Sequence, residues 1–276
     1  MSEKSIHQGP AGDSVRAAWE TNAPFWDAYF KEGNDFHRTL VGPAAEALLE
    51  IVPGERVLDI ACGNGAFSRR LASLGARVTA FDFSATFIER AVERTTELLE
   101  RITYHVLDAT DPAQWAVLGD VRFDAAVCNM ALMDMSDIEV LARELPQHLT
   151  PSARFVFTTM HPCFNHVGCR MSIEEEDRDG DLITTYGVRV TRYMTPFSAR
   201  GIGIRGQPVP QVYFHRPLHV LLRPFLDAGF VLNGLDEHAF GGSVGGQVPT
   251  SWGNFPEIPP LLAARLIPAA NRRSDA

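Results

Sequence analysis

The apolar positions of the chain follow two spacings, first helical and then strand-like. Spacings of three and four residues predict helices over 13–31 and 36–51, and Pro53 and Gly54 end the second helix. Near-continuous apolar runs follow, separated by helical segments. The runs predict strands over 56–61, 77–81, 102–107, 123–128 and 154–159, with helices over 65–74, 84–100 and 136–149 and a short turn over 112–117 between them. This alternation indicates a parallel sheet covered by helices on both faces.

After residue 159 the alternation stops. The rest of the chain shows an acidic run at 174–177, strand-like stretches at 182–193 and 209–214, a helix over 216–228, and strands over 230–235 and 261–266. An insertion of about 50 residues is too long for a plain connection, so we predict a lid or substrate-binding segment. The acidic run is interpreted as a solvated face rather than a metal site. The predicted fold is α/β, with a doubly wound, mostly parallel seven-stranded sheet, N-terminal helices and a lid insertion.

Composition and charge narrow the range of partners. The chain has 276 residues, 45% of them hydrophobic, and a formal net charge of −9, which disfavours nucleic acid as a partner. No run of about 18 apolar residues is present, and the first residues lack the apolar core of a signal peptide. We therefore expect a cytoplasmic protein that binds a small molecule and neither nucleic acid nor membrane. The sequence leaves open whether the protein forms a homo-oligomer.

A glycine-rich turn follows the first predicted strand. Gly63 and Gly65 let the backbone approach a ligand closely, and doubly wound sheets bind ligands at this end of their strands. Asp59 lies four residues before Gly63 and needs a cationic or donor-rich partner to stay charged when buried. Asp82 closes the second strand, where an acid can accept both hydroxyls of a ribose.

Two nucleotide cofactors compete for this pattern. The dinucleotide fingerprint has a third glycine where this chain has Ser68, and a diphosphate would be repelled by Asp59. An α-amino group would instead be attracted by Asp59. S-adenosylmethionine carries both an ammonium group and a ribose, so the pattern favours this cofactor over NAD.

Residues 57–84 resemble motif I and the following strand of class I S-adenosylmethionine-dependent methyltransferases, in particular small-molecule (natural-product) members. Ala61 stands where the family pattern has its first glycine. The resemblance extends to the ends of the third and fourth strands, where the family contacts the adenine and lines the cofactor. It implies a Rossmann-like methyltransferase fold and a cofactor site formed by Phe36, Asp59, Ala61, Cys62, Gly63, Asn64, Gly65, Phe67, Asp82, Phe83, Ser84, Asp108, Ala109, Asn129, Met130 and Ala131.

The resemblance also implies a division of the chain. We expect an N-terminal helical flap over 1–52, the cofactor-binding half of the α/β domain over 53–161, the lid insertion over 162–215 and the C-terminal part of the domain over 216–276. The aromatic first helix is either part of the core or a flap over the cofactor, with Tyr29, Asn34 and Phe36 as flap candidates. Aromatic side chains in the insertion suit a sizeable, partly apolar ligand, namely Tyr186, Tyr193, Phe197, Tyr213 and Phe214.

His161 and Tyr29 are the predicted catalytic residues. His161 comes just after the fifth strand, where a neutral imidazole can accept a proton near neutral pH; the alternative is a histidine that only anchors the lid. The segment 161–169 holds two histidines and two cysteines, but four ligands in so short a loop would need a very tight turn. We therefore expect no metal.

The predicted function is methyl transfer from S-adenosylmethionine to carbon, oxygen or nitrogen of a small, partly apolar metabolite in secondary metabolism. Two alternatives remain from the residues: an S-adenosylmethionine-binding cyclase or non-methylating binding protein, and a nucleotide-dependent oxidoreductase.

Overall fold

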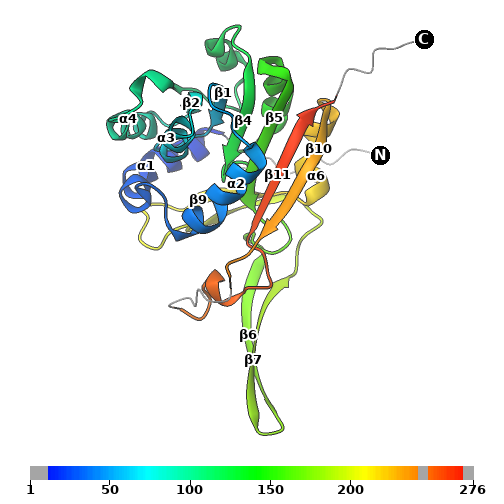
Figure 1. Cartoon of the computed structure of the whole chain (residues 1–276). Helices are drawn as coiled ribbons and strands as arrows, with labels where there is room; N and C mark the ends of the chain where they lie inside the picture. Colours follow the sequence, from blue (N-terminus) through cyan, green and yellow to red (C-terminus); the bar gives the residue numbers. More distant parts are fainter. Residues whose placement is uncertain (1–11, 242–247, 270–276) are drawn as a thin grey trace, which may run out of the picture.

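A twisted seven-stranded sheet forms the centre of the computed structural model, which describes residues 12–241 and 248–269 (Figure 1). The strand order is β10-β11-β5-β4-β1-β2-β3. The strands are β1 (Arg56–Ile60), β2 (Arg77–Asp82), β3 (Ile102–Val106), β4 (Phe123–Asn129), β5 (Leu149–Met160), β10 (Phe230–His238) and β11 (Leu261–Pro268). The first five are parallel, and β11 runs antiparallel to both β5 and β10. The predicted fold class is confirmed.

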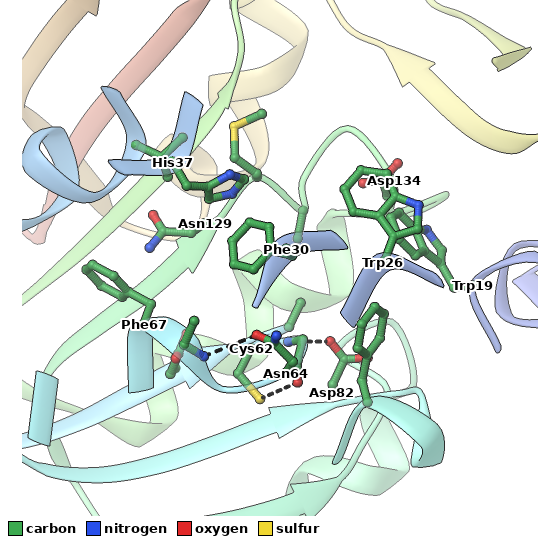
Figure 2. Close-up of a pocket in the computed structure, with 18 of the residues that line it drawn as sticks. Trp19, Trp26, Phe30, His37, Cys62, Asn64, Phe67, Asp82, Asn129 and Asp134 are labelled. Carbon is green, nitrogen blue, oxygen red and sulfur yellow. Dashed lines mark hydrogen bonds between the residues drawn. The ribbon is translucent and has the colours of Figure 1, made fainter. Parts of the chain in front are cut away.

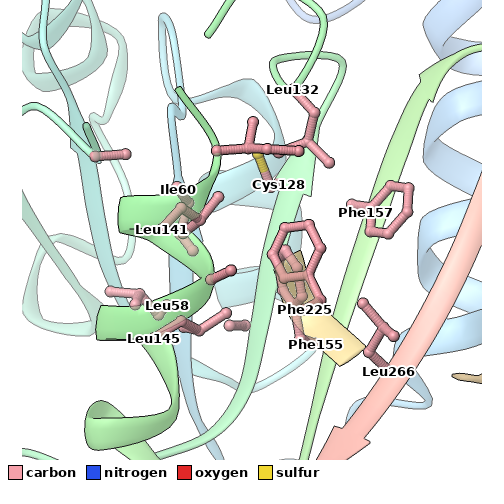
Figure 3. Packing of buried hydrophobic residues seen from close by; sticks show 14 of the residues in the cluster. Leu58, Ile60, Cys128, Leu132, Leu141, Leu145, Phe155, Phe157, Phe225 and Leu266 are labelled. Carbon is pink, nitrogen blue, oxygen red and sulfur yellow. The ribbon is translucent and has the colours of Figure 1, made fainter. Parts of the chain in front are cut away.

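Helices cover both faces of this sheet. They are α1 (Gly12–Phe30), α2 (Gly42–Leu49), α3 (Ala66–Ser73), α4 (Ala85–Arg94), α5 (Glu139–Glu144) and α6 (Leu218–Asp227). Side chains of α2 and α3 join one buried cluster, and those of α5 and α6 join the other. In the second cluster Phe155 and Phe157 of β5 pack against Phe225 of α6 (Figure 3). The apolar strands are buried from both sides, as the uninterrupted apolar runs predict. None of the described helices is long and apolar enough to cross a membrane.

Three predicted helices differ from those observed. The helix over 84–100 ends at Arg94, because the Thr95 hydroxyl binds the Ala91 carbonyl and Leu98 adopts a left-handed backbone. The helix over 36–51 begins with a π-helical turn, His37–Val41. The helix over 136–149 is α-helical only in α5 and continues as a 3-10 turn that contains Pro146, which lacks the N–H that an α-helical bond needs.

The insertion forms two antiparallel hairpins. Strands β6 (Cys169–Arg178) and β7 (Asp181–Val190) project away from the body, and the exposed acidic run lies on β6 (Figure 1). Strands β8 (Phe197–Gly201) and β9 (Gln211–His215) return to the body, where β9 packs against α1. Sequence reasoning found the β7 and β9 stretches but missed β6. A hairpin in solvent buries no continuous face, so β6 has no apolar alternation that predicts a strand.

Candidate active site

A cavity of about 1260 Å³ lies at the carboxyl ends of β1 to β4, beneath α1. It is larger than the roughly 300–1,000 Å³ of a typical ligand pocket. Figure 2 shows Trp19, Trp26 and Phe30 of α1 above the turn that carries Cys62 and Asn64. The cavity walls include most of the predicted cofactor residues: Phe36, Asp59, Ala61, Cys62, Gly63, Asn64, Phe67, Asp82, Phe83, Asp108, Ala109, Asn129, Met130 and Ala131.

The glycine turn forms the floor of the cavity. Gly63 has φ +54°, and a Cβ placed there would have no protein atom within 4 Å. Gly63 therefore leaves open space on the cavity side. Gly65 has a different role from the predicted one, because it does not line the cavity. A Cβ at Gly65 would lie 2.5 Å from the Tyr104 hydroxyl, so this glycine allows the turn to pack on β3.

Asp59 is buried at the end of β1 and still lines the cavity. Its Oδ2 accepts a hydrogen bond of 2.6 Å from the Ser68 hydroxyl. Burial raises the pKa of Asp59 to about 7, the nearby charge of Asp82 raises it too, and the Ser68 hydrogen bond opposes the shift. The site thus holds a carboxyl group that a cationic ligand would stabilise in its charged form. In the sequence, Ser68 was considered only as a departure from the dinucleotide fingerprint, and its hydroxyl group was overlooked.

Asp82 lies at the end of β2, with both carboxylate oxygens placed by the backbone. Oδ2 accepts from the Gly63 N–H at 2.9 Å, and Oδ1 accepts from the Ser84 N–H at 2.9 Å. Burial raises the pKa of Asp82 to about 6 against the effect of these two hydrogen bonds. Ser84 itself does not line the cavity, which corrects its predicted role. Its hydroxyl accepts the Phe87 N–H and begins α4 as an N-cap.

Hydrogen bonds hold α1 over the cavity. Arg16 donates to the Phe83 carbonyl and to Asp108 Oδ2, and so bridges the ends of β2 and β3. The Asn64 amide donates to Asp27 Oδ1 at 3.0 Å and to the Lys31 carbonyl at 2.8 Å. Asp108 and Asn64 were predicted as direct cofactor contacts, but these side-chain groups tie the first helix to the sheet.

Tyr29 lies outside the cavity, which contradicts its predicted catalytic role. Its side chain is 53% exposed and stacks on Phe25, because the inward-facing stripe of α1 carries Trp19, Trp26 and Phe30 instead. The aromatic residues of the insertion do not all line the cavity. Tyr213 lines the main cavity, whereas Tyr186 packs on Phe255.

The turn after β4 forms the opposite wall. Asn129 accepts the Thr158 hydroxyl with Oδ1 at 2.9 Å, and its buried Nδ2 has no partner in the described part of the chain. Met130 follows with φ +52°, an uncommon conformation for a residue with a side chain. The amide of Asn129 is therefore a donor without an acceptor at the edge of the cavity (Figure 2).

His37 is a lining residue that sequence reasoning did not consider. Its Nδ1 lies 3.1 Å from Asn34 Oδ1 and its ring meets the edge of Phe30. Burial lowers the pKa of His37 to about 4, so the imidazole is neutral. A neutral ring that donates through Nδ1 keeps Nε2 as a hydrogen-bond acceptor.

The structure contradicts the prediction that His161 is the catalytic base. His161 is 1% exposed and does not line the cavity. Nε2 lies 2.7 Å from Glu237 Oε1, and Nδ1 accepts the Cys163 N–H at 3.1 Å. Both ring nitrogens are engaged, so no lone pair is free for a substrate proton. His161 anchors the start of the insertion to β10, as the alternative interpretation held.

His161→Ala is therefore expected to reduce stability and to leave catalysis intact. The variant loses the acceptor of the partly buried Cys163 N–H, which costs about 0.5–1.5 kcal/mol of unfolding free energy. His161→Asn is the matched control, because its side-chain oxygen can accept the same N–H. Denaturant unfolding combined with single-turnover kinetics checks this. A turnover loss of about 10²-fold with unchanged stability would restore His161 as a base.

The segment 161–169 contains no disulfide and shows no metal-like arrangement. Cys163 and Cys169 are free thiols, and His166 stacks on His215 with ring centroids 4.0 Å apart. Across residues 12–241 and 248–269, no three histidine, cysteine or acidic side chains are grouped as metal ligands.

The sheet order, the glycine turn beside Asp59 and Asp82, and the helical roof together define the Rossmann-like methyltransferase class of folds. Residues 57–152 match the family model described as "Methyltransferase domain". This part of the chain therefore matches the kind of domain that the sequence pattern indicates.

Curated relatives and solved structures agree. The chain is 31% identical over 110 residues to the ubiquinone biosynthesis O-methyltransferase of Xanthomonas campestris pv. campestris, covering 40% of this chain and 45% of the relative. It is 30% identical over 156 residues to the 2-phytyl-1,4-naphtoquinone methyltransferase of Synechococcus elongatus, covering 55% and 65%. An S-adenosylmethionine-dependent methyltransferase of Mesorhizobium loti superposes with a TM-score of 0.62 at 24% identity, covering 81% of this chain and 95% of that one. The matches to the two curated relatives thus span about half of their length.

Proposed function

We propose that this protein transfers a methyl group from S-adenosylmethionine to a small, partly apolar metabolite. The observation that carries the proposal is the pair of buried carboxyl groups, Asp59 and Asp82, beside the open space at Gly63. Burial raises the pKa values of both carboxyl groups, and nearby acidic side chains raise them further. A ligand with an ammonium group and a ribose supplies the donors that these two groups lack.

The polar groups that line the cavity match the charged and polar groups of this cofactor. Asp59 would attract the ammonium group, and the Asp82 carboxylate, already oriented by two backbone N–H groups, would accept the ribose hydroxyls. Asn129 Nδ2 would supply a donor at the far wall. The sulfonium group of the cofactor provides an activated methyl group. The walls of the cavity then align the acceptor and exclude water, which is the protein's main contribution to such a displacement.

The acceptor side of the cavity is aromatic and apolar. Trp26 and Phe30 of α1 and Tyr213 of β9 line it, and such walls suit a ring system. The two curated relatives carry names that refer to quinone compounds, which supports an acceptor of this type. A role in secondary metabolism, a cytoplasmic location, and the absence of nucleic-acid and membrane partners complete the proposal.

Calorimetry tests the proposed cofactor. We expect S-adenosylhomocysteine to bind with one site per chain and NAD to show no binding, because a diphosphate would face Asp59 and Asp82. Tight binding of NAD would contradict the proposal and favour the oxidoreductase. Binding of S-adenosylhomocysteine without methyl transfer to any aromatic acceptor tested would favour a cyclase or a binding protein.

A further inference from the structure

One carboxyl group in the cavity lies outside the cofactor residues. Asp134 follows β4, lines the cavity and is 8% exposed. Its Oδ1 is fully buried and has no hydrogen-bond partner within the described residues. In the view of Figure 2, Asp134 lies on the same side of the cavity as Trp26 and away from Asn129 and His37. An unpartnered buried carboxyl group destabilises the fold, so its presence calls for a ligand that satisfies it.

The backbone around Asp134 is held firmly. The Arg216 guanidinium donates to the carbonyls of Leu132, Met135 and Ser136. The Phe214 N–H donates to the Met133 carbonyl at 2.7 Å, which joins β9 to the same turn. Arg216 thus binds the turn through its carbonyls and leaves the Asp134 carboxyl group free. Rigid support of this kind is what a residue that positions a substrate requires.

Two hydrogen-bond donors lie near Asp134. The indole Nε1 of Trp26 is buried and has no partner in the described chain. The Tyr213 hydroxyl meets the Trp26 ring at Gly203, since a Cβ on Gly203 would lie 2.7 Å from the hydroxyl and 2.9 Å from Trp26. Burial is the main cause of the raised pKa of Tyr213, and the charge of Asp134 raises it further, so the two groups interact electrostatically.

A chain of amides sets the direction of the Tyr213 hydroxyl. The backbone N–H groups of Gly203 and Ile204 both donate to Gln207 Oε1. Gln207 Nε2 therefore donates to Gln211 Oε1, and Gln211 Nε2 donates to the Tyr213 oxygen at 2.9 Å. Because its oxygen accepts from Gln211, the Tyr213 O–H proton is directed elsewhere and acts as a donor.

The cavity also lacks a cation for an acidic ligand. Its lining arginines are all ion-paired in the described structure: Arg16 with Asp108, Arg38 with Asp35, Arg69 with Glu32, Arg70 with Glu46 and Arg94 with Asp27. An anionic acceptor would meet Asp134 with no compensating charge from these side chains. A neutral hydroxyl compound or an amine would instead donate to it.

We propose that Asp134 binds the methyl acceptor through the O–H or N–H of its nucleophilic group and takes up the proton that this group releases. The inference rests on the proposed methyl transfer. The acceptor's lone pair forms the new bond to the methyl carbon, the C–S bonding pair stays on the sulfur, and the O–H or N–H proton passes to the Asp134 carboxylate. Trp26 and Tyr213 donate to a second oxygen of the acceptor. Anionic acceptors are excluded.

Near neutral pH, the other titratable groups around Asp134 do not compete with it for the proton of the acceptor. Burial raises the pKa of Cys128 on β4 and of Tyr213 on β9, so both stay protonated. Burial lowers the pKa of Arg216 to about 10, which leaves it cationic, and that of His166 to about 4, which leaves it neutral. Burial also raises the pKa of Asp134 itself. Ionisation of Asp134 therefore destabilises the ligand-free protein as the pH rises. In the complex, the O–H or N–H donor of the acceptor and the positive charge of the cofactor's sulfonium group favour the carboxylate form that takes up the proton.

The first measurement is thermal unfolding of the ligand-free protein. Unfolded Asp ionises at about pH 4, so the wild type loses stability relative to Asp134→Asn as the pH rises above that value. The unfolding temperature of Asp134→Asn is therefore expected to exceed that of the wild type by about 2–4 °C more at pH 8 than at pH 5. Asp137→Asn is the matched control, because Asp137 is exposed on the same turn and its side chain accepts the Glu139 N–H. Equal unfolding temperatures of Asp134→Asn and wild type at both pH values would overturn the buried, unpartnered state.

The second measurement is an NMR titration. Four probes, each with a single ring, are added separately to protein that is saturated with S-adenosylhomocysteine. Phenol and benzylamine are expected to bind the wild type and Asp137→Asn about 10-fold or more tighter than toluene and benzoate. Asp134→Asn and Asp134→Ala should lose this preference. If both Asp134 variants keep the preference, or if the wild type binds benzoate as tightly as phenol, the proposed role of Asp134 is wrong. The proposed methyl transfer would not be affected by that result. Failure of S-adenosylhomocysteine to bind the wild type would overturn the proposed function as well.

Discussion

Asp82→Ala is expected to weaken the binding of S-adenosylhomocysteine by about 10²–10⁴-fold. Two charge-assisted hydrogen bonds to the ribose contribute about 1.5–3 kcal/mol each, and about 1.4 kcal/mol corresponds to a factor of ten. The structure adds a second effect. Asp82 also accepts the N–H groups of Gly63 and Ser84, so its removal loosens the turn that supports the cofactor. Calorimetry measures the affinity, and circular dichroism checks that the fold is retained.

The pH dependence of the same binding reports on the charge of Asp82. Its pKa of about 6 in the ligand-free protein means that the carboxylate is ionised at pH 8 and protonated at pH 5. Donors of the ribose prefer the ionised form, so the affinity should fall as the pH drops below about 6, by at most about tenfold per unit for this one group. Asp82→Asn should remove this part of the pH profile and leave the part that arises from Asp59 near pH 7. An Asp82→Ala protein with normal affinity at both pH values would mean that the ribose is held elsewhere.

Gly63→Val is expected to abolish binding of S-adenosylhomocysteine to below the limit of calorimetry. No protein atom lies within 4 Å of a Cβ at this position, so the valine side chain would not clash with the protein. It would instead occupy the space that the cofactor needs. The φ of +54° adds backbone strain of about 1–2 kcal/mol, which lowers stability in addition. The expected result is therefore a folded protein of lower stability without cofactor affinity.

Gly119→Val separates the strain from the loss of space. Gly119 also has a positive φ, +58°, and open space around its Cβ, but it does not line the cavity. This variant should lose stability and keep the affinity of the wild type. If Gly63→Val binds as well as Gly119→Val, the turn does not contact the cofactor and the proposed site is wrong.

Local patterns explain why the centre of the site was predictable. A strand buried on both faces carries an uninterrupted apolar run, and the glycine turn with Asp59 and Asp82 lies within two neighbouring strand ends. Their spacing therefore placed the candidate cofactor residues along one cavity. Asp134 had a weaker signal, an acid between Met133 and Met135 just after a strand, whose significance depends on burial by distant elements.

Side-chain direction and partner choice explain the incorrect site predictions. Tyr29 and Phe30 are neighbours on one helix, yet only the packing of α1 on α4 and β9 decides which of them faces the cavity. His161 has the position expected of a base, but Glu237 is 76 residues away in sequence and occupies its Nε2. A local sequence pattern cannot predict a contact between residues that lie so far apart in the chain.

The sequence alone determined the layered sheet, the position of the cofactor turn and the two carboxyl groups beside it, because periodicity and short spacings act over a few residues. The tertiary structure decided which side chains have free polar atoms. Asn64 and Asp108 contact α1, His161 is paired with β10, and Asp134 lacks a partner in the described chain. These outcomes depend on how segments from α1, β4, β9 and β10 meet, and burial by such segments sets both hydrogen bonding and charge.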